Sequence, residues 1–282
     1  MKKALTLAML LICCTQMWGN NIRYTQGDSI KICEKLARLY KNREKKRATL
    51  LVEAAKLFIG TPYVGGTLDK EREERLTVNA SELDCTTLVE TSLAMAMTVS
   101  DGKRDFATFC GNLKKIRYRS GECKGYDSRL HYFSWWVADG AKKGIVHEIN
   151  GKAFGGRQLL NLCFMSSNPD KYMQLNGDSA LTAAIARHEA PFSQKEIHFL
   201  QKALLKGTKK SLPVRDGDII ALVTNIKGLD VTHMGIAVWV KGKLHMLHAS
   251  SKEKKVILDP TPLHDYLAPR KSCPGVRVVR VK

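Results

Sequence analysis

The chain has 282 residues, and its 46 Lys and Arg residues against 27 Asp and Glu residues give a formal net charge of +19 at pH 7. Its length and its hydrophobic content of 44% are sufficient for a packed core, which excludes dependence on the disulfide framework of small secreted domains. The basic residues fall in scattered runs typical of solvated surfaces, but their excess also favours attraction to a polyanionic surface.

The first twenty residues predict a secretory signal peptide rather than a part of the fold. Lys2 and Lys3 form a short cationic start, and residues 4–14 are apolar but too few to span a bilayer. Cleavage is expected near residues 19–21, and loss of the two lysines would leave a net charge of +17. We therefore expect an exported, periplasmic protein.

A lipoprotein signal is the alternative at this end of the chain, with Cys13 or Cys14 as the acylated residue. Ile12 argues against it, because a small residue usually stands before the acylated cysteine. No later segment reaches the ~18 uninterrupted apolar residues of a membrane span, so the mature protein is expected to be soluble. In the envelope, a polymer that carries carboxylates fits the basic charge better than nucleic acid does.

The predicted elements are helices first and short strands last. Apolar residues at three- and four-residue spacing predict helices at 28–41, 48–59, 85–99, 104–116, 128–142, 179–188 and 193–205. The last of these begins with a capping box, Ser193-Gln194-Lys195-Glu196. Strands are predicted at 145–149, 218–223, 231–240, 244–249, 256–258 and 276–281, with a short helix at 261–267.

This order predicts an α+β fold in which the helix that begins at Cys85 packs on an antiparallel sheet. We expect one domain over residues 21–282, with a mostly helical insertion at about 101–212. The mature chain has six cysteines, at positions 33, 85, 110, 123, 163 and 273. Their even number allows disulfides, and Cys110 with Cys123 is the first pair to test. No Cys-x-x-Cys pair is present, which argues against a structural zinc site.

Cys85 is the candidate nucleophile. It follows a Gly/Pro/Tyr turn at residues 60–66 and directly begins a predicted helix. In the first turn of a helix, unpaired N–H groups and the positive end of the helix dipole both favour thiolate over thiol. A lone cysteine before a helix is more often a small buried hydrophobic residue, so the assignment depends on what accompanies it.

The predicted hairpin identifies which histidines face each other. A two-residue turn at 241–242, with Gly second as a type I′ turn prefers, sets the register of the two strands. In that register His233 lies diagonal to His248 on one face, ~7–8 Å apart and within reach of two long side chains. His245 points to the other face, which also argues against a metal site formed with His248.

These residues predict cysteine hydrolase chemistry. The thiolate of Cys85 would attack a carbonyl carbon, and His233 would hold it as an ion pair and then protonate the leaving amine. His248 would hydrogen-bond the far nitrogen of that ring and set its tautomer. The backbone N–H of Cys85 and the hydroxyl of Tyr63 are candidates to stabilise the oxyanion, and Asp84 is a further candidate beside the nucleophile.

The substrate pocket is expected in the long segment between Cys85 and His233. Arg can form a bidentate pair with a carboxylate, and aromatic rings can stack on sugar or peptide faces. The candidates are Arg129, His131, Tyr132, Trp135 and Trp136. The alternative interpretation is a helix with an aromatic face in the core.

Three segments resemble the NlpC-type cell-wall cysteine peptidases, which have a papain-like fold. They are residues 60–66 with 83–89, residues 216–220, and residues 233–238 with 247–250. The resemblance implies that Cys85 is the nucleophile, His233 the base and His248 the orienting residue, that Tyr63 shapes the oxyanion site, and that no metal or cofactor takes part.

The 148 positions from Cys85 to His233 exceed the separation in the short members of that superfamily. The chain is similar instead to the longer N-acetylmuramoyl-L-alanine amidase-like branch. We therefore expect an exported cysteine amidohydrolase that acts on peptidoglycan or muropeptides, with the bond between muramic acid and L-alanine favoured. The alternatives are a stem-peptide endopeptidase that cuts beside D-glutamate and the diamino acid, a non-catalytic envelope-binding module, and acyl transfer to or from a lipid.

Overall fold

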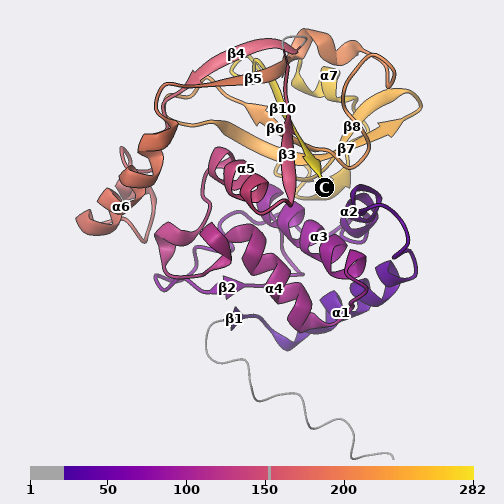
Figure 1. Ribbon diagram of the computed structural model, residues 1–282, viewed down its shortest axis with the longest axis horizontal. Coiled ribbons are helices and arrows are strands. Elements are labelled where there is room, and N and C mark those ends of the chain that lie inside the picture. The colour runs from indigo at the N-terminus through magenta and orange to yellow at the C-terminus, as the bar shows by residue number, and fades with distance from the viewer. Residues whose placement is uncertain (1–21, 152–153) are drawn as a thin grey trace, which may run out of the picture.

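The computed structural model describes residues 22–151 and 154–282 (Figure 1). The predicted signal peptide, with Cys13 and Cys14, lies outside the described residues. Within them, none of the helices is both long enough and apolar enough to cross a membrane.

A layer of helices packs beneath an eight-stranded antiparallel sheet (Figure 1). The helices are α1 (Gln26–Tyr40), α2 (Arg47–Lys56), α3 (Cys85–Ser100), α4 (Phe106–Arg117), α5 (Phe133–Lys142), α6 (Ser179–Glu189) and α7 (Leu263–Leu267). Two short strands, β1 (Ile22–Arg23) and β2 (Leu76–Thr77), pair in parallel at the edge of the helical layer. The sheet strands are β3 (Val146–Ile149), β4 (Gly155–Leu160), β5 (Lys195–Gln201), β6 (Ile219–Val223), β7 (Val231–Val240), β8 (Lys243–Ser250), β9 (Lys255–Leu258) and β10 (Gly275–Val281).

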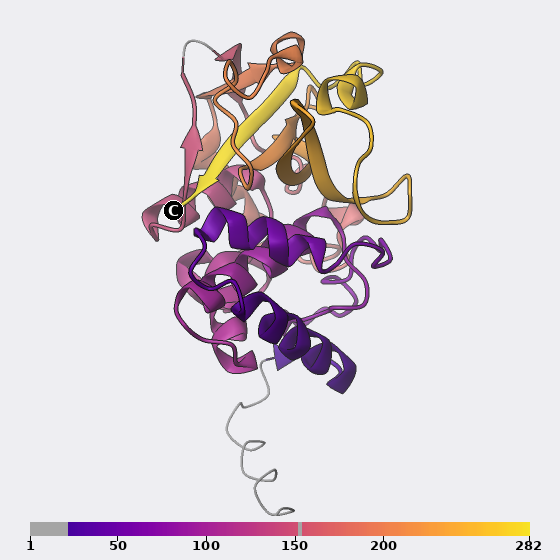
Figure 2. The ribbon, with the colours of Figure 1, turned by 90° about the vertical axis from the view of Figure 1, so that its right-hand side faces the viewer.

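The strands follow the order β4-β5-β10-β6-β7-β8-β9, and β3 pairs with β10. Figure 2 shows α1 to α4 on one side of the sheet and α7 on the other. The larger apolar core lies between the helices and the sheet, and a smaller one lies beneath α7. The predicted α+β class is therefore confirmed.

Helix α3 is the central helix because it is apolar around almost its whole circumference. Every residue from Thr87 to Val99 is buried, between the sheet strands β7 and β8 and the helices α2 and α4. Asp84 starts the helix: its carboxylate accepts a hydrogen bond of 2.8 Å from the Thr87 N–H, and the Thr87 hydroxyl caps the Asp84 N–H at 2.9 Å. This cap places Cys85 at the first helical position.

The predicted helix at 193–205 is wrong. Residues 195–201 form β5. Residues 195–200 of this strand pair with β4, and residues 200–201 pair with β10. Gln194 has φ 55°, which no helix start allows, so the capping-box pattern does not operate. Phe199 lies over Gly156 of β4, where a Cβ would come within 2.3 Å of its ring. This sheet contact outweighs the local helix signal.

Residues 101–212 contain α4, α5 and α6, in keeping with a mostly helical insertion. They also supply β3, β4 and β5 to the same sheet as the C-terminal strands, and of these only β3 was predicted. Strand β4 was not predicted, because its two leading glycines are typical of a loop. All six cysteines of the described residues are free, so Cys110 and Cys123 do not pair.

Candidate active site

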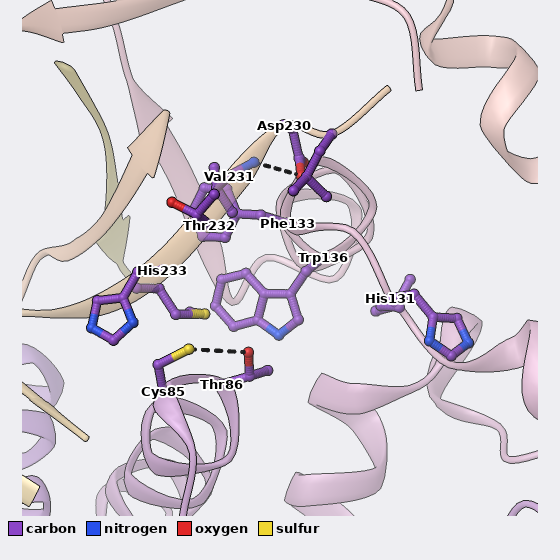
Figure 3. A pocket seen from close by; sticks show the side chains of 12 residues that line it. Cys85, Thr86, His131, Phe133, Trp136, Asp230, Val231, Thr232 and His233 are labelled. Atoms are coloured by element: carbon purple, nitrogen blue, oxygen red, sulfur yellow. Dashed lines mark hydrogen bonds between the residues drawn. The ribbon is translucent and has the colours of Figure 1, made fainter. Parts of the chain in front are cut away.

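A pocket of about 130 Å³ opens at the amino end of α3, between that helix, α5 and the start of β7 (Figure 3). It is lined by Cys85, Thr86, Leu130, His131, Phe133, Trp136, Leu229, Asp230, Val231, Thr232, His233 and Met234. The structure thus brings together four of the predicted site residues, from segments up to 148 positions apart. They are the candidate nucleophile and base, and two members of the predicted substrate pocket: Cys85, His233, His131 and Trp136.

The sulfur of Cys85, a half-buried residue, lies in this pocket. Its Sγ is 4.0 Å from the Thr86 hydroxyl, and the backbone N–H of Met234 donates to it. Burial, followed by the charge of Asp84, raises the pKa of Cys85 to about 11. Burial therefore opposes the effect of the helix terminus, and the thiolate form of Cys85 stays a prediction.

The predicted register of the hairpin is confirmed. Residues 241–242 have φ 48° and 79°, as a type I′ turn requires, and Val240 pairs with Lys243 across it. His233 consequently lies diagonal to His248, and Nε2 of His233 is 2.7 Å from Nδ1 of His248. Two adjacent strands therefore present a hydrogen-bonded imidazole pair.

Gly235 makes this close approach possible. A Cβ at that position would lie 2.9 Å from the Cβ of His248 and 2.6 Å from the side chain of Met246. His245 points to the other face, as predicted, and its Nδ1 lies 2.9 Å from the backbone oxygen of Asp259. Only one of the two histidines on β8 therefore faces His233.

Asp259 extends the pair, and sequence reasoning missed it. Its Oδ2 lies 3.3 Å from Nε2 of His248, and its Oδ1 accepts a hydrogen bond of 2.8 Å from the Thr261 N–H. The residue is only 8% exposed. Ile257 pairs with His248 across β8 and β9, and Asp259 lies two residues beyond it. Strand alternation was the signal that would have found this carboxylate.

The carboxylate determines which nitrogens carry protons. An ionised Asp259 only accepts, so the hydrogen-bond network assigns the proton of His248 to Nε2. Nδ1 of His248 is then an acceptor for the Nε2–H of His233. This leaves Nδ1 of His233 unprotonated, which is the form a general base requires.

Burial acts on both imidazoles in the same direction. Burial, and then the charges of His248 and Arg270, lower the pKa of His233 to about 3. Burial also lowers the pKa of His248, although the hydrogen bond and charge of Asp259 oppose that shift. Together with the raised pKa of Cys85, these shifts favour a neutral thiol and imidazole over the predicted ion pair.

Tyr63 and Asp84 flank the nucleophile but do not line the pocket. A bridge between Tyr63 and Leu83 holds the turn beside the start of α3. Burial, and then the charges of Cys85 and Asp84, raise the pKa of Tyr63, so its hydroxyl stays protonated and able to donate. The carboxylate of Asp84 caps the amino end of α3 instead of pointing into the pocket.

Arg129 does not face the pocket. It is 5% exposed, it is paired with Asp69, and its Nε lies 3.7 Å from Glu74. A guanidinium already held by two carboxylates is not available to a substrate carboxylate, so the predicted contact is not supported. These ion pairs connect the loop before β2 to the insertion.

Helix α5 directs its aromatic residues to opposite sides. Tyr132, just before the helix, donates to buried Glu189 at 2.6 Å, and Trp135 packs edge-on against the Tyr132 ring. Neither lines the pocket, so for these two the alternative of an aromatic core face holds. His131 and Trp136 do line it. Nε2 of His131 lies 2.7 Å from the Tyr126 backbone oxygen, and burial lowers the pKa of this imidazole.

Comparison with known proteins places this fold and site in a family. Residues 53–276 match the family described as AmiA-like, N-acetylmuramoyl-L-alanine amidase-like. An N-acetylmuramoyl-L-alanine amidase from Bacteroides uniformis ATCC 8492 is 39% identical, with a TM-score of 0.79, and the similarity covers 84% of this chain and 100% of that chain. No curated protein matches the chain.

Two further structures extend the comparison. A Bacteroides fragilis protein provisionally named a xylanase is 44% identical, with a TM-score of 0.74, over 80% of this chain and 98% of that chain. A Legionella pneumophila protein is 21% identical, with a TM-score of 0.65, over 90% of this chain and 96% of that chain, and it shares the fold. The family match spans most of the chain. It agrees with the name of the Bacteroides uniformis protein that is 39% identical. The chain therefore belongs to the N-acetylmuramoyl-L-alanine amidase-like family.

Proposed function

We propose that the protein is a cysteine amidase that hydrolyses the amide between the lactyl group of muramic acid and L-alanine, in peptidoglycan or its fragments. The observation that carries the proposal is the hydrogen-bonded series from Asp259 through His248 to His233, which ends at the pocket that holds Cys85. Binding alone does not require this series beside a thiol. The names of the Bacteroides uniformis relatives support the choice of bond.

In the proposed reaction, the thiol of Cys85 loses its proton to Nδ1 of His233 as sulfur attacks the carbonyl carbon. Because burial raises the pKa of Cys85 and lowers that of His233, the proposed reaction has proton transfer accompany the attack. His248 stabilises the imidazolium that forms, and Asp259 holds His248 in the required tautomer. The backbone N–H of Cys85 and the Tyr63 hydroxyl are the proposed donors to the oxyanion.

The tetrahedral intermediate then breaks at the carbon–nitrogen bond. His233 returns its proton to the amine of L-alanine, which leaves with the stem peptide, and the muramoyl group remains on sulfur as a thioester. Water attacks that thioester with His233 again acting as the base, and the products are a free lactyl carboxylate and the free thiol. His233 returns each proton within the same half of the cycle: the thiol proton goes to the leaving amine, and the proton taken from water goes to the leaving thiolate.

We also propose that the protein acts in the periplasm, where its substrate lies. The cationic and apolar pattern of residues 1–20 supports export. The net charge of +19 supports attraction to a wall polymer that carries carboxylates.

Mass spectrometry of digested peptidoglycan tests the proposal. Purified sacculi and soluble muropeptides are incubated with the mature protein, and new ends are identified. New amino groups on L-alanine and new lactyl carboxylates are expected, and Cys85→Ala should abolish them while leaving the fold intact. New carboxylates on D-glutamate would indicate a stem-peptide endopeptidase instead. Equal cleavage by Cys85→Ala, or no new ends with any substrate, would refute cysteine amidase activity.

A further inference from the structure

Trp136 places an unsatisfied hydrogen-bond donor at the candidate active site. The side chain is 4% exposed and lines the pocket, and its indole Nε1 has no hydrogen-bond partner among residues 22–151 and 154–282. Figure 3 shows the indole beside Cys85, with its nitrogen on the edge of the ring nearest Thr86. Buried donors are nearly always paired in proteins, so an exception within a functional pocket indicates a group that a ligand completes.

The other lining residues restrict what that ligand group can be. The pocket lining contains no Lys or Arg. Its one carboxylate, Asp230, is 1% exposed and already accepts from the N–H groups of Ser134 at 2.6 Å and Val231 at 2.9 Å. Arg277 lies 3.8 Å from Oδ2 of Asp230 but does not line the pocket, so a substrate carboxylate would find no cation among the lining residues to pair with. A neutral acceptor oxygen avoids that cost and still pairs with the indole.

We propose that Trp136 is a specificity-determining residue, whose indole N–H donates to a neutral amide carbonyl oxygen of the substrate. The inference rests on the proposed amidase function and refines it. Peptidoglycan offers two sources of such an oxygen close to the scissile bond: the acetamido group of muramic acid and the carbonyls of the stem peptide. The same pocket disfavours a stem-peptide carboxylate at this position.

Trp135 provides a matched control. It is the next residue along the same helix, it is 1% exposed, and its Nε1 also lacks a hydrogen-bond partner among the described residues. It does not line the pocket. Trp135→Phe and Trp136→Phe therefore remove the same buried group from α5, but only Trp136→Phe removes a donor from the pocket.

Steady-state kinetics test the role of Trp136. The substrate is a disaccharide-peptide monomer released from peptidoglycan. Trp136→Phe should raise KM about tenfold, the effect of one lost hydrogen bond, with kcat changed less than about threefold because the bond is present in ground and transition states alike. A variant carrying benzothienylalanine at position 136 keeps the ring shape and lacks only the N–H, so it should show the same KM. Trp135→Phe should lower Tm without this rise in KM.

The same monomer without the N-acetyl group of its muramic acid identifies the source of the oxygen. If Trp136 binds the acetamido group, the wild type already shows the high KM on this analogue and Trp136→Phe adds nothing. If it binds a peptide carbonyl, Trp136→Phe raises KM equally on both substrates. A benzothienylalanine variant with wild-type KM, or an equal rise in KM for Trp135→Phe, overturns the proposal.

A binding measurement keeps the two proposals separable. If the wild type releases no product, the amidase function fails. Calorimetry with Cys85→Ala and with Cys85→Ala/Trp136→Phe then still tests the donor. The proposal predicts about a tenfold weaker Kd for the disaccharide-peptide monomer in the double variant. Equal Kd values, or binding by neither protein, would overturn it.

Discussion

Nε2 of His233 lies 2.7 Å from Nδ1 of His248, and this contact determines which nitrogen of His233 is left to act as a base. The hydrogen bond exists because the turn at 241–242 sets the register of β7 and β8 and because Gly235 carries no side chain between the strands. The same register turns His245 to the other face, so the two histidines of β8 should differ sharply in mutational effect.

His233→Ala should lower kcat by about 10²–10⁴-fold, the usual contribution of a general acid–base group. His245→Ala should change kcat by less than about tenfold, because this imidazole faces away from His233 and its Nδ1 lies 2.9 Å from the backbone oxygen of Asp259. Release of stem peptide from a soluble muropeptide measures both variants, and circular dichroism confirms that each is folded. A loss for His245→Ala as large as that for His233→Ala would contradict the assigned roles.

Asp259→Ala should lower kcat by about 10–100-fold with little change in KM, because the carboxylate orients His248 and does not touch substrate. Asp265→Asn is the control, since this nearby carboxylate is exposed and pairs with His264 instead. The pH profile of kcat distinguishes orientation from general stability: loss of Asp259 removes an effect that raises the pKa of His248, so the profile should shift. An unchanged profile with unchanged kcat would remove Asp259 from the site.

Alkylation of Cys85 by iodoacetamide should become faster by about tenfold for each pH unit from 7 to about 10. Burial raises the pKa of this thiol to about 11, so only a small fraction is thiolate near neutral pH, and thiolate is the reactive form. Mass spectrometry of the peptide that contains Cys85 gives the rate separately from exposed Cys33. A rate that is already constant above pH 7 would mean that a thiolate–imidazolium pair exists in the free enzyme.

Folding stability should fall as the pH drops from 6.5 toward 3. In this window the unfolded chain binds a proton at His233 that the folded chain excludes, since burial lowers the pKa of His233 from the ordinary 6.5 to about 3. The lowered pKa of His248 acts in the same direction. Urea unfolding at several pH values should therefore show a weaker acid dependence for His233→Gln than for the wild type. Equal slopes would indicate that His233 is solvated in the folded protein.

Arg129→Met should destabilise the protein by about 3–5 kcal/mol, because it removes the guanidinium that lies 3.7 Å from the buried carboxylate of Glu74. KM for a soluble muropeptide should stay within about twofold, since Arg129 does not line the pocket. The double variant Arg129→Met/Glu74→Gln should recover part of the lost stability. A large rise in KM with unchanged stability would restore the earlier hypothesis that Arg129 binds a substrate carboxylate.

The placement of the two facing histidines and of Cys85 could be predicted because its signals are local. Turn chemistry at 241–242 and the two-residue period of a strand are enough to bring His233 to His248, whatever the rest of the fold does. The apolar spacing of residues 85–99 likewise predicts α3, and Cys85 stands at its first turn. The Asp259 contact obeys the same alternation. It was not predicted, because Asp259 lies one residue beyond the end of the short strand β9.

Other features depend on contacts between distant segments, which no local pattern contains. Strand β5 forms because β4 and β10 offer it a pairing edge, and this outweighs the helix signal at Ser193. The side of α5 that faces the pocket is decided by packing, so adjacent Trp135 and Trp136 meet different surroundings.

The sequence by itself determined the identity and pairing of the candidate residues, since residue type, turn and alternation are properties of short segments. Only the tertiary structure decided how far they are desolvated. A helix terminus favours thiolate, but α3, α5 and β7 surround the sulfur, and burial raises the pKa of Cys85 to about 11. Desolvation depends on every element that surrounds a group, so it follows from the assembled fold rather than from any one stretch of the chain.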